Sequence, residues 1–155
     1  MYNHAPQDYI CPLCLLGNGE YKSPLVVVPD DVVLKTERIT AFISSRWWPN
    51  NKGHIIVISN FHFENLYDID TQYLHEIVDI SQKMAIAIKK AYGCDGITVR
   101  QHNEPAGSQD VWHYHMHVIP RYTNDNFYKT DAIEGWIDPQ ERKGYADKVK
   151  TVLSL

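Results

Sequence analysis

The chain has 155 residues, of which 44% are hydrophobic and 22% are charged, so it can form one globular domain with a substantial apolar core. Its formal net charge of −4 disfavours a nucleic-acid polymer as a partner, because proteins that bind such polymers present a broad basic face. The sequence has no apolar run long enough to span a membrane, and its first residues do not resemble a signal peptide, so a cytoplasmic protein is expected.

The N-terminal half predicts several short strands. The first 24 residues combine two cysteines with glycines and a proline, which favours a turn-rich segment. Leu25–Val28 is expected to form a short strand or an edge segment. Val32–Lys35 and Thr40–Ser44 are rich in β-branched or aromatic residues and flank a short polar stretch, so they predict a hairpin. A further strand is expected over His54–Ser59, after a turn.

Two helices are predicted. The clearest spans Thr71–Tyr92, where apolar residues recur at steps of three and four and therefore share one face. Asp70 can cap the start of this helix, and Gly93 can end it. A second helix is expected near the C-terminus, over Asp138–Leu153.

The remaining elements fix the fold class. Gly96–Arg100 and Trp112–Pro120 are predicted strands, and the loop between them contains a proline, a glycine and a serine. Most strands follow one another through short connections, which favours antiparallel pairing. The sequence therefore predicts an α+β fold.

The strand predicted at Trp112–Pro120 carries histidines at alternate positions. Because alternate side chains of a strand point to opposite faces, His113, His115 and His117 would share one face, and the apolar residues between them would pack on the long helix. Three imidazoles on one face could bind a catalytic metal. Alternatively, one imidazole could be a nucleophile that the others support, since histidine titrates near neutral pH.

The cysteines suggest a second site. Cys11 and Cys14 are separated by two residues and could supply half of a tetrahedral metal site. A redox pair and two buried thiols are the alternatives. Cys94 follows the predicted end of the long helix and is expected to be a small buried residue.

The histidine segment resembles a known signature. His113–Ile119 is similar to the histidine triad pattern, in which three alternating histidines are separated by apolar residues. Residues 53–58, 61–65 and 107–111 are similar to the glycine-histidine strand, the strand-to-helix turn and the phosphate loop of the same family. The resemblance covers about Cys11 to Arg121 and points to the histidine triad (HIT) family. Within it, the chain resembles the zinc-containing bacterial hydrolases of the Hint and diadenosine polyphosphate hydrolase branch.

The resemblance implies an architecture and an assembly. The fold would be HIT-like, with an antiparallel sheet of about five strands, one long helix and a C-terminal helix. The chain would be a single HIT domain over residues 1–155, with a zinc knuckle at 1–24, a catalytic core at 25–121 and a C-terminal tail at 122–155. It would form a homodimer, which covers the exposed strand edges.

The resemblance also implies an activity. The protein would be a nucleotide hydrolase that cleaves dinucleoside polyphosphates or nucleoside phosphoramidates at the α-phosphate, through a covalent nucleotidyl-histidine. The alternatives are a nucleotidyltransferase or phosphorylase, a nucleotide-binding regulatory module with little turnover, and a metal hydrolase that uses all three histidines as ligands.

Individual residues receive roles from the same resemblance. His115, the middle histidine, would attack the α-phosphorus, and its second nitrogen would be hydrogen-bonded so that the attacking nitrogen is unprotonated. His117 and His54 would line the site and contact phosphate or orient the nucleophile. Gln109 would bind phosphate oxygens together with nearby backbone amides, and Asn103 is a further candidate for this contact.

The chain departs from the family pattern at two places. Ser108 and Asp110 belong to the phosphate loop, but Asp110 stands where family members often have a serine or threonine that assists the leaving group. An aspartate could donate a proton there only if its pKa were raised. The acidic or amide residue that usually holds the ribose is also replaced, and Ser44, Ser45 or Arg46 could take its place.

The resemblance extends to a structural metal. Bacterial members of the family hold zinc with two N-terminal cysteines, the histidine of the turn and the first histidine of the triad. The matching residues here are Cys11, Cys14, His62 and His113. Such a closed site would contribute to folding rather than to chemistry.

Overall fold

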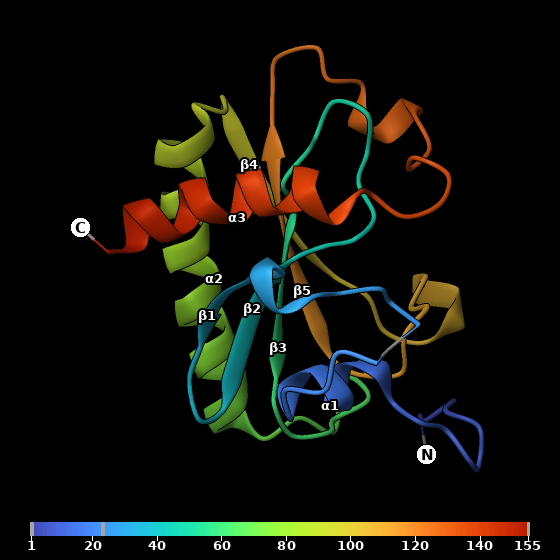
Figure 1. The fold of residues 1–155 in the computed structure, drawn as a ribbon. Helices are drawn as coiled ribbons and strands as arrows, with labels where there is room; N and C mark the ends of the chain where they lie inside the picture. The colour runs from blue at the N-terminus through green and yellow to red at the C-terminus, as the bar shows by residue number, and fades with distance from the viewer. Residues whose placement is uncertain (1, 23, 155) are drawn as a thin grey trace.

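The computed structural model describes residues 2–22 and 24–154, and it confirms an α+β fold built on a five-stranded antiparallel sheet (Figure 1). The strands are β1 (Val32–Lys35), β2 (Ile39–Ile43), β3 (Ile55–Ser59), β4 (Gly96–Gln101) and β5 (His115–Arg121), arranged in the order β1-β2-β3-β5-β4. The α helices are α1 (Pro12–Gly17), α2 (Thr71–Tyr92) and α3 (Pro139–Leu153).

The register of the sheet decides which residues share a face. Ile56 of β3 lies opposite Phe42 of β2 and opposite His117 of β5. On its other edge, β5 pairs with β4 so that His117 lies opposite Arg100. Residues directly opposite each other in antiparallel strands point to the same side, so one face of the sheet carries Phe42, Ile56, His117 and Arg100 together.

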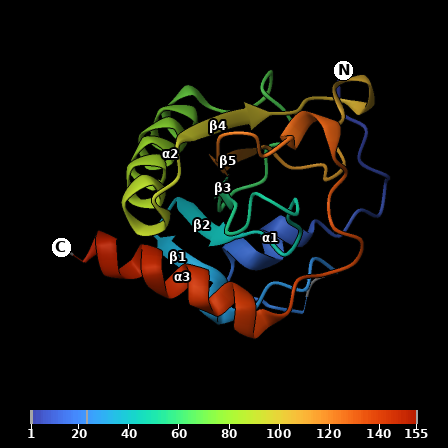
Figure 2. The ribbon, with the colours of Figure 1, turned by 90° about the horizontal axis from the view of Figure 1, so that it is seen from above.

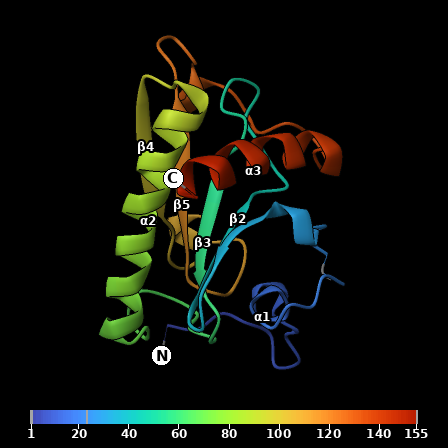
Figure 3. The ribbon, with the colours of Figure 1, turned by 60° about the vertical axis from the view of Figure 1, so that its left-hand side comes forward.

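The two long helices cover the opposite face. Figures 2 and 3 show α2 and α3 on one side of the sheet and α1 on the other. The core between the helices and the sheet is apolar because the intervening strand residues and one face of α2 are apolar. Its fully buried members include Ile43, Ile55, Val57, Val118, Ile77, Met84, Ile88, Ala146 and Val149. A smaller apolar cluster beneath α1 consists of Cys11, Leu13, Leu16, Val27, Phe42 and Ile58.

The predicted helices and the predicted hairpin are confirmed. Helix α2 has the predicted bounds; the Asp70 carboxylate accepts a hydrogen bond from Gln72 N at 2.8 Å, and Gly93 ends the helix with φ of 64°. The hairpin forms between β1 and β2, and Asp138 caps α3. Among the described residues, the helices lack the length or the apolar character needed to cross a bilayer.

Two strand predictions are wrong in part. Leu25–Val28 forms no strand, and Val26 has φ of 53°, which no regular strand contains. The strand predicted from Trp112 begins only at His115. His113 lies in a turn before it, where His113 N donates to Val111 O at 2.8 Å. The alternation that groups the three histidines therefore holds only for His115 and His117.

A buried ion pair fixes α3 to the rest of the molecule. The guanidinium of Arg142 donates from Nε and Nη2 to the two carboxylate oxygens of Asp31, each at 2.9 Å, and both side chains are fully buried. Arg142 also donates to the carbonyl oxygens of Ile137 and Val26. Each of the three guanidinium nitrogens thus donates at least one hydrogen bond, as a buried charge requires.

We expect Arg142→Met to lower the free energy of unfolding by about 3–5 kcal/mol, because it leaves the Asp31 carboxylate buried without a counterion. Urea denaturation measures this change. The matched control is Lys143→Met, which removes an exposed ion pair to Asp147 and should cost less than about 1 kcal/mol. Equal losses in the two variants would contradict the expectation.

Candidate active site

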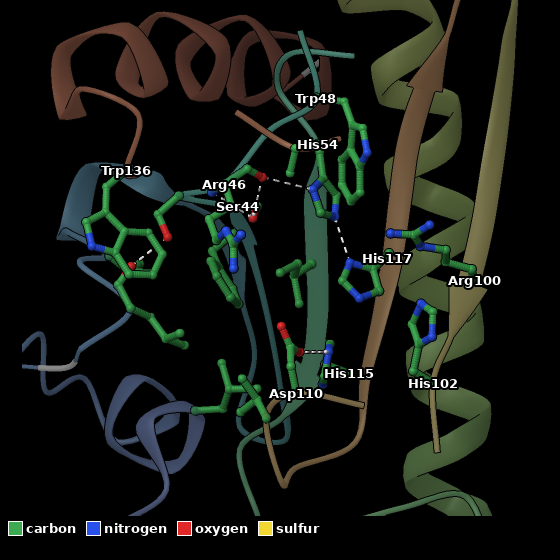
Figure 4. A pocket seen from close by; sticks show the side chains of 18 of the residues that line it. Ser44, Arg46, Trp48, His54, Arg100, His102, Asp110, His115, His117 and Trp136 are labelled. Carbon is green, nitrogen blue, oxygen red and sulfur yellow. Dashed lines mark hydrogen bonds and ion pairs between the residues drawn. The ribbon is translucent and has the colours of Figure 1, made fainter. Parts of the chain in front are cut away.

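A pocket of about 380 Å³ opens on the face of the sheet that α2 and α3 leave free (Figure 4). Its wall has an apolar part and a part rich in polar and charged groups. The apolar part comprises Leu13, Leu25, Val27, Phe42, Ile56, Val111, Ala132 and Trp136. The other part comprises Ser44, Ser45, Arg46, Trp48, His54, Arg100, His102, Ser108, Asp110, His115 and His117.

His115 is held in one tautomer at the centre of the pocket. Its Nδ1 lies 2.7 Å from the carbonyl oxygen of His113, and because a carbonyl only accepts, Nδ1 carries the proton. This confirms the expected hydrogen bond on the second nitrogen. Nε2 lies 4.0 Å from Oδ1 of Asp110, the nearest acidic oxygen (Figure 4). Burial lowers the pKa of His115, so Nε2 has a free lone pair that can attack an electrophile.

His54 and His117 form a hydrogen-bonded pair next to the nucleophile. His54 Nδ1 lies 3.4 Å from the carbonyl oxygen of Arg46, and its Nε2 lies 2.8 Å from His117 Nδ1. If His54 donates to the carbonyl, its Nε2 accepts from His117, and the second nitrogen of His117 is then unprotonated. Burial lowers the pKa of His54 to about 3 and that of His117 well below its usual value, so both rings are neutral.

The neutral state of His54 predicts a pH dependence of stability. The unfolded chain protonates this histidine with a pKa of about 6.5, whereas the folded chain keeps it neutral down to about 3. The unfolded state therefore binds more protons between these values, and stability falls as the pH drops from 7 to 5. Between pH 7 and pH 5, His54 alone should lower the free energy of unfolding by about 2 kcal/mol.

Urea denaturation of wild type and His54→Asn at pH 7 and pH 5 measures this contribution. The wild type should lose more stability on acidification than the variant, and acid release of a metal would affect both proteins alike. The matched control is His75→Asn, because His75 is exposed on α2 and lies outside the pocket. An equal loss in wild type and His54→Asn would refute the expectation.

Cys11, Cys14, His62 and His113 meet in a cluster that could hold a metal ion. Their ligand atoms all lie within 4.8 Å of one another. The sulfur-to-nitrogen distances are 3.3 Å for Cys11–His113, 3.3 Å for Cys14–His62 and 3.5 Å for Cys14–His113. Zinc bond lengths in a tetrahedron place sulfur and nitrogen ligands ~3.5 Å apart, so the donor set and its spacing fit the ion.

The surroundings of the cluster favour metal binding as well. His113 Nε2 lies 3.1 Å from the carbonyl oxygen of Ser59 and therefore carries the ring proton, which leaves Nδ1 free to ligate. The hydrogen bond from the Cys14 thiol lowers the pKa of Cys11, so that Cys11 is the thiolate of the pair. His113 does not line the pocket.

Asn103 and Gln109, both predicted to bind phosphate, do not line the pocket. Gln109 donates to the Glu64 carbonyl oxygen at 2.6 Å and accepts from Glu104 N at 2.8 Å. Asn103 accepts from Leu66 N at 2.7 Å. These amide groups fasten the loop before β5 to the turn after β3.

The other predicted binding residues do line the pocket, but the hydroxyl groups of two of them already form hydrogen bonds with the backbone. Ser44 Oγ donates to the carbonyl oxygen of Arg46 at 3.0 Å and accepts from Arg46 N at 3.2 Å. Ser45 Oγ donates to the carbonyl oxygen of Leu25. Arg46 itself is exposed, with Cζ 6.0 Å from the Trp136 ring centroid. Ser108 lines the wall beside Asp110 with φ of 67°.

Among the lining residues with a guanidinium, imidazole or indole side chain, four were not assigned a role from the sequence: Trp48, Arg100, His102 and Trp136. A signal existed for two of them. Arg100 and His102 are two positions apart at the end of β4, and they share the face of His117 once the β4–β5 register is known. Trp136 reaches the pocket through the segment before α3, for which no local pattern exists.

The sheet, the buried imidazoles above it and the adjoining cysteine–histidine cluster define a small α+β protein with a histidine-lined pocket. A family model described as "HIT domain" matches residues 26–124. The chain therefore belongs to the histidine triad family, and its HIT-like fold is confirmed.

Two relatives illustrate the range of the family. An uncharacterized HIT-like protein of Methanocaldococcus jannaschii is 31% identical over 116 residues, which cover 75% of this chain and 82% of the relative. An adenosine 5'-monophosphoramidase of Saccharomyces cerevisiae is 28% identical over 132 residues, which cover 85% of this chain and 73% of the relative.

Solved structures show the same fold. A Hit-like protein from Bartonella henselae is 30% identical, with a TM-score of 0.78 and coverage of 96% of this chain and 99% of the other. A zinc-bound histidine triad protein from Mycobacterium smegmatis is 23% identical, with a TM-score of 0.74 and coverage of 93% of each chain.

Proposed function

We propose that the protein hydrolyses nucleotides at the α-phosphate through a covalent nucleotidyl-histidine on His115, with dinucleoside polyphosphates or nucleoside phosphoramidates as substrates. The observation that carries the proposal is the geometry of His115, whose Nδ1 is locked to a carbonyl while Nε2 stays unprotonated in the pocket. Family membership supports it, since the family includes a protein named as an adenosine 5'-monophosphoramidase.

The reaction would proceed in two displacements. The nucleoside occupies the apolar end of the pocket, near Phe42 and Trp136, and His115 Nε2 forms a bond to the α-phosphorus as the bond to the leaving group breaks. The leaving group takes the electron pair of the broken bond: a leaving phosphate keeps it as negative charge, and a leaving amine takes up a proton from water. In the second step water attacks the phosphorus, the bond from phosphorus to His115 Nε2 breaks with its electron pair returning to that nitrogen, and the unprotonated nitrogen of His117 accepts a proton from the water, so that the nucleoside monophosphate is released.

The remaining polar residues would support these steps. His54 orients His117 through the 2.8 Å hydrogen bond between their rings. Ser108 and the backbone of its loop contact the phosphate, while Asn103 and Gln109 hold that loop in place rather than touch the substrate. Ser44 and Arg46 border the nucleoside, with Ser44 shaping the backbone and Arg46 contributing charge.

Incubation with a panel of dinucleotides and phosphoramidates, followed by mass analysis of the products, tests the proposal. A nucleoside monophosphate and the free leaving group are expected. Transfer of the nucleotidyl group to added phosphate would favour the phosphorylase alternative, and binding without products would favour a regulatory module. The three-histidine metal hydrolase is disfavoured, because His113 lies with the cysteines rather than in the pocket.

We further propose that the cysteine–histidine cluster holds a structural zinc ion. The two thiols and two imidazoles match the donors that zinc prefers, and their spacing fits a closed tetrahedron. The ion would join α1 to β3 and to the start of β5. It supplies no group to the reaction, because the site has no open position for a substrate.

We also propose that the chain acts as one HIT domain over 1–155, in the cytoplasm, and as a homodimer. Strand β4 is an edge of the sheet, and its apolar side chain Val99 is half exposed. We expect light scattering at micromolar concentration to give twice the chain mass of 18.0 kDa. A mass of one chain would exclude the dimer under these conditions.

A further inference from the structure

Arg100 is a half-buried cation in the wall of the pocket. Over residues 2–22 and 24–154, the structure gives its side chain no hydrogen bond and no ion pair, and its Nε is buried. Burial lowers the pKa of Arg100, although a guanidinium keeps its proton at any physiological pH. Withdrawing a charge from water costs free energy unless another group compensates it, and an anionic ligand in the pocket would do so.

The contacts that Arg100 does make leave its donors free. Its Cζ lies 4.8 Å from the Trp48 ring centroid and 5.1 Å from that of Phe127. Aromatic rings contact the face of a guanidinium, whereas its N–H groups radiate along the edge. Stacking therefore fixes the position of the group without consuming its hydrogen bonds.

The aromatic support is itself firmly held. Phe127 N donates to Asp125 Oδ1 at 3.0 Å, and the Asp125 carboxylate accepts from Arg121 Nε and Nη2 at 2.7 and 2.9 Å. The rings of Phe127 and Trp48 lie 4.8 Å apart. Arg100 is thus held in place by a rigid turn, which is typical of a binding group that must be positioned in advance.

The location of Arg100 relates it to the nucleophile. It lies opposite His117 in the sheet, and His102, two residues further on, places its ring 5.7 Å from that of His117. Figure 4 shows Arg100 and His102 on one side of His115 and Trp136 on the other. A nucleoside beside Trp136, with its α-phosphorus at His115, would therefore direct its leaving group toward Arg100.

We propose that Arg100, with His102 beside it, forms a subsite for an anionic leaving group, so that the preferred substrates carry a second phosphoryl group on the α-phosphate. The inference rests on the proposed function. When His115 Nε2 bonds to the α-phosphorus, the bond to the bridging oxygen breaks and its electron pair stays on the leaving phosphate. The guanidinium N–H groups stabilise that developing charge. A neutral amine, the leaving group of a phosphoramidate, gains nothing from them.

Kinetics with two substrates tests the subsite. In Arg100→Leu we expect kcat/KM for diadenosine triphosphate to fall about 10- to 100-fold, while kcat/KM for adenosine 5'-monophosphoramidate changes less than about threefold. Arg100→Lys keeps the charge and should recover part of the loss. The matched control is Arg46→Leu at the nucleoside end, which should slow both substrates by the same factor. Equal slowing of both substrates in Arg100→Leu would overturn the inference.

A binding measurement separates this inference from the proposed function. Calorimetry should show that wild type binds α,β-methylene-ADP about 10- to 100-fold more tightly than AMP, and that Arg100→Leu binds the two alike. If this holds but no substrate is turned over, the subsite stands and the proposed function fails. If wild type is active but the affinity ratio is the same in Arg100→Leu, the subsite is wrong and the function stands. If wild type binds neither compound, the subsite is also wrong.

Discussion

Replacing His115 with asparagine is expected to abolish nucleotide turnover while the fold and the metal content stay as they are. Nε2 of His115 is the attacking atom in the proposed mechanism, and the asparagine amide has no lone pair that can replace it. The amide can still donate to the carbonyl oxygen of His113, so the start of β5 keeps its hydrogen bond. Loss of a nucleophile costs on the order of a millionfold in kcat.

Two further variants and a trapping experiment complete this test. His117→Asn should slow turnover less, because it removes a proton acceptor rather than the nucleophile. His75→Asn, on the exposed side of α2, should leave turnover unchanged. Wild type mixed with labelled substrate and quenched in neutral denaturant should carry the label on the peptide that contains His115. If His115→Asn hydrolyses every wild-type substrate at a near-normal rate, the mechanism is wrong.

Local sequence patterns predicted most of the fold, because local chemistry decides these elements. Helix α2 begins after a capping aspartate and ends at a glycine in the left-handed conformation. Both residues can be recognised in the sequence without any knowledge of distant contacts. Leu25–Val28 has strand-like composition, yet it is held in an irregular path by distant groups: Ser45 Oγ and the Arg142 guanidinium donate to its carbonyl oxygens. Contacts between residues that are far apart in the sequence produce no local sequence pattern.

The residues of the candidate site also fall into two groups: those that local motifs predict and those that depend on contacts between distant segments. His54, His115 and His117 could be singled out because they stand in motifs, and the cysteine pair marked its own site. Arg100 and His102 depend on the register between β4 and β5, which is set by side-chain packing across the sheet. Asn103 and Gln109 fall in the loop that the family pattern marks, but their amides satisfy backbone groups, and only the three-dimensional hydrogen bonds reveal this.

Removal of the metal is expected to destabilise the protein by several kcal/mol and to loosen the segment that contains α1. The proposed ligands connect Cys11 and Cys14 to the turn at His62 and to His113, and the apolar cluster beneath α1 is small. The zinc ion would add a link between this segment and the sheet, beside that cluster and the hydrogen bond from Trp112 N to the Tyr9 hydroxyl at 3.2 Å. Structural zinc contributes about 10–16 kcal/mol in isolated zinc-finger peptides, which sets an upper bound here.

Metal analysis of the purified protein should give one zinc ion per chain, and chelation should lower the unfolding temperature markedly. Cys11→Ser should reduce the zinc content, whereas Cys94→Ser is the matched control and should leave it at one, because Cys94 is buried at the end of α2, outside the cluster. Any chelated protein that remains folded should still turn over substrate, since the ion supplies no reacting group. A metal-free protein with the unfolding temperature of the zinc-loaded form would rule out the structural role, and activity lost while the fold persists would point instead to a metal-dependent reaction.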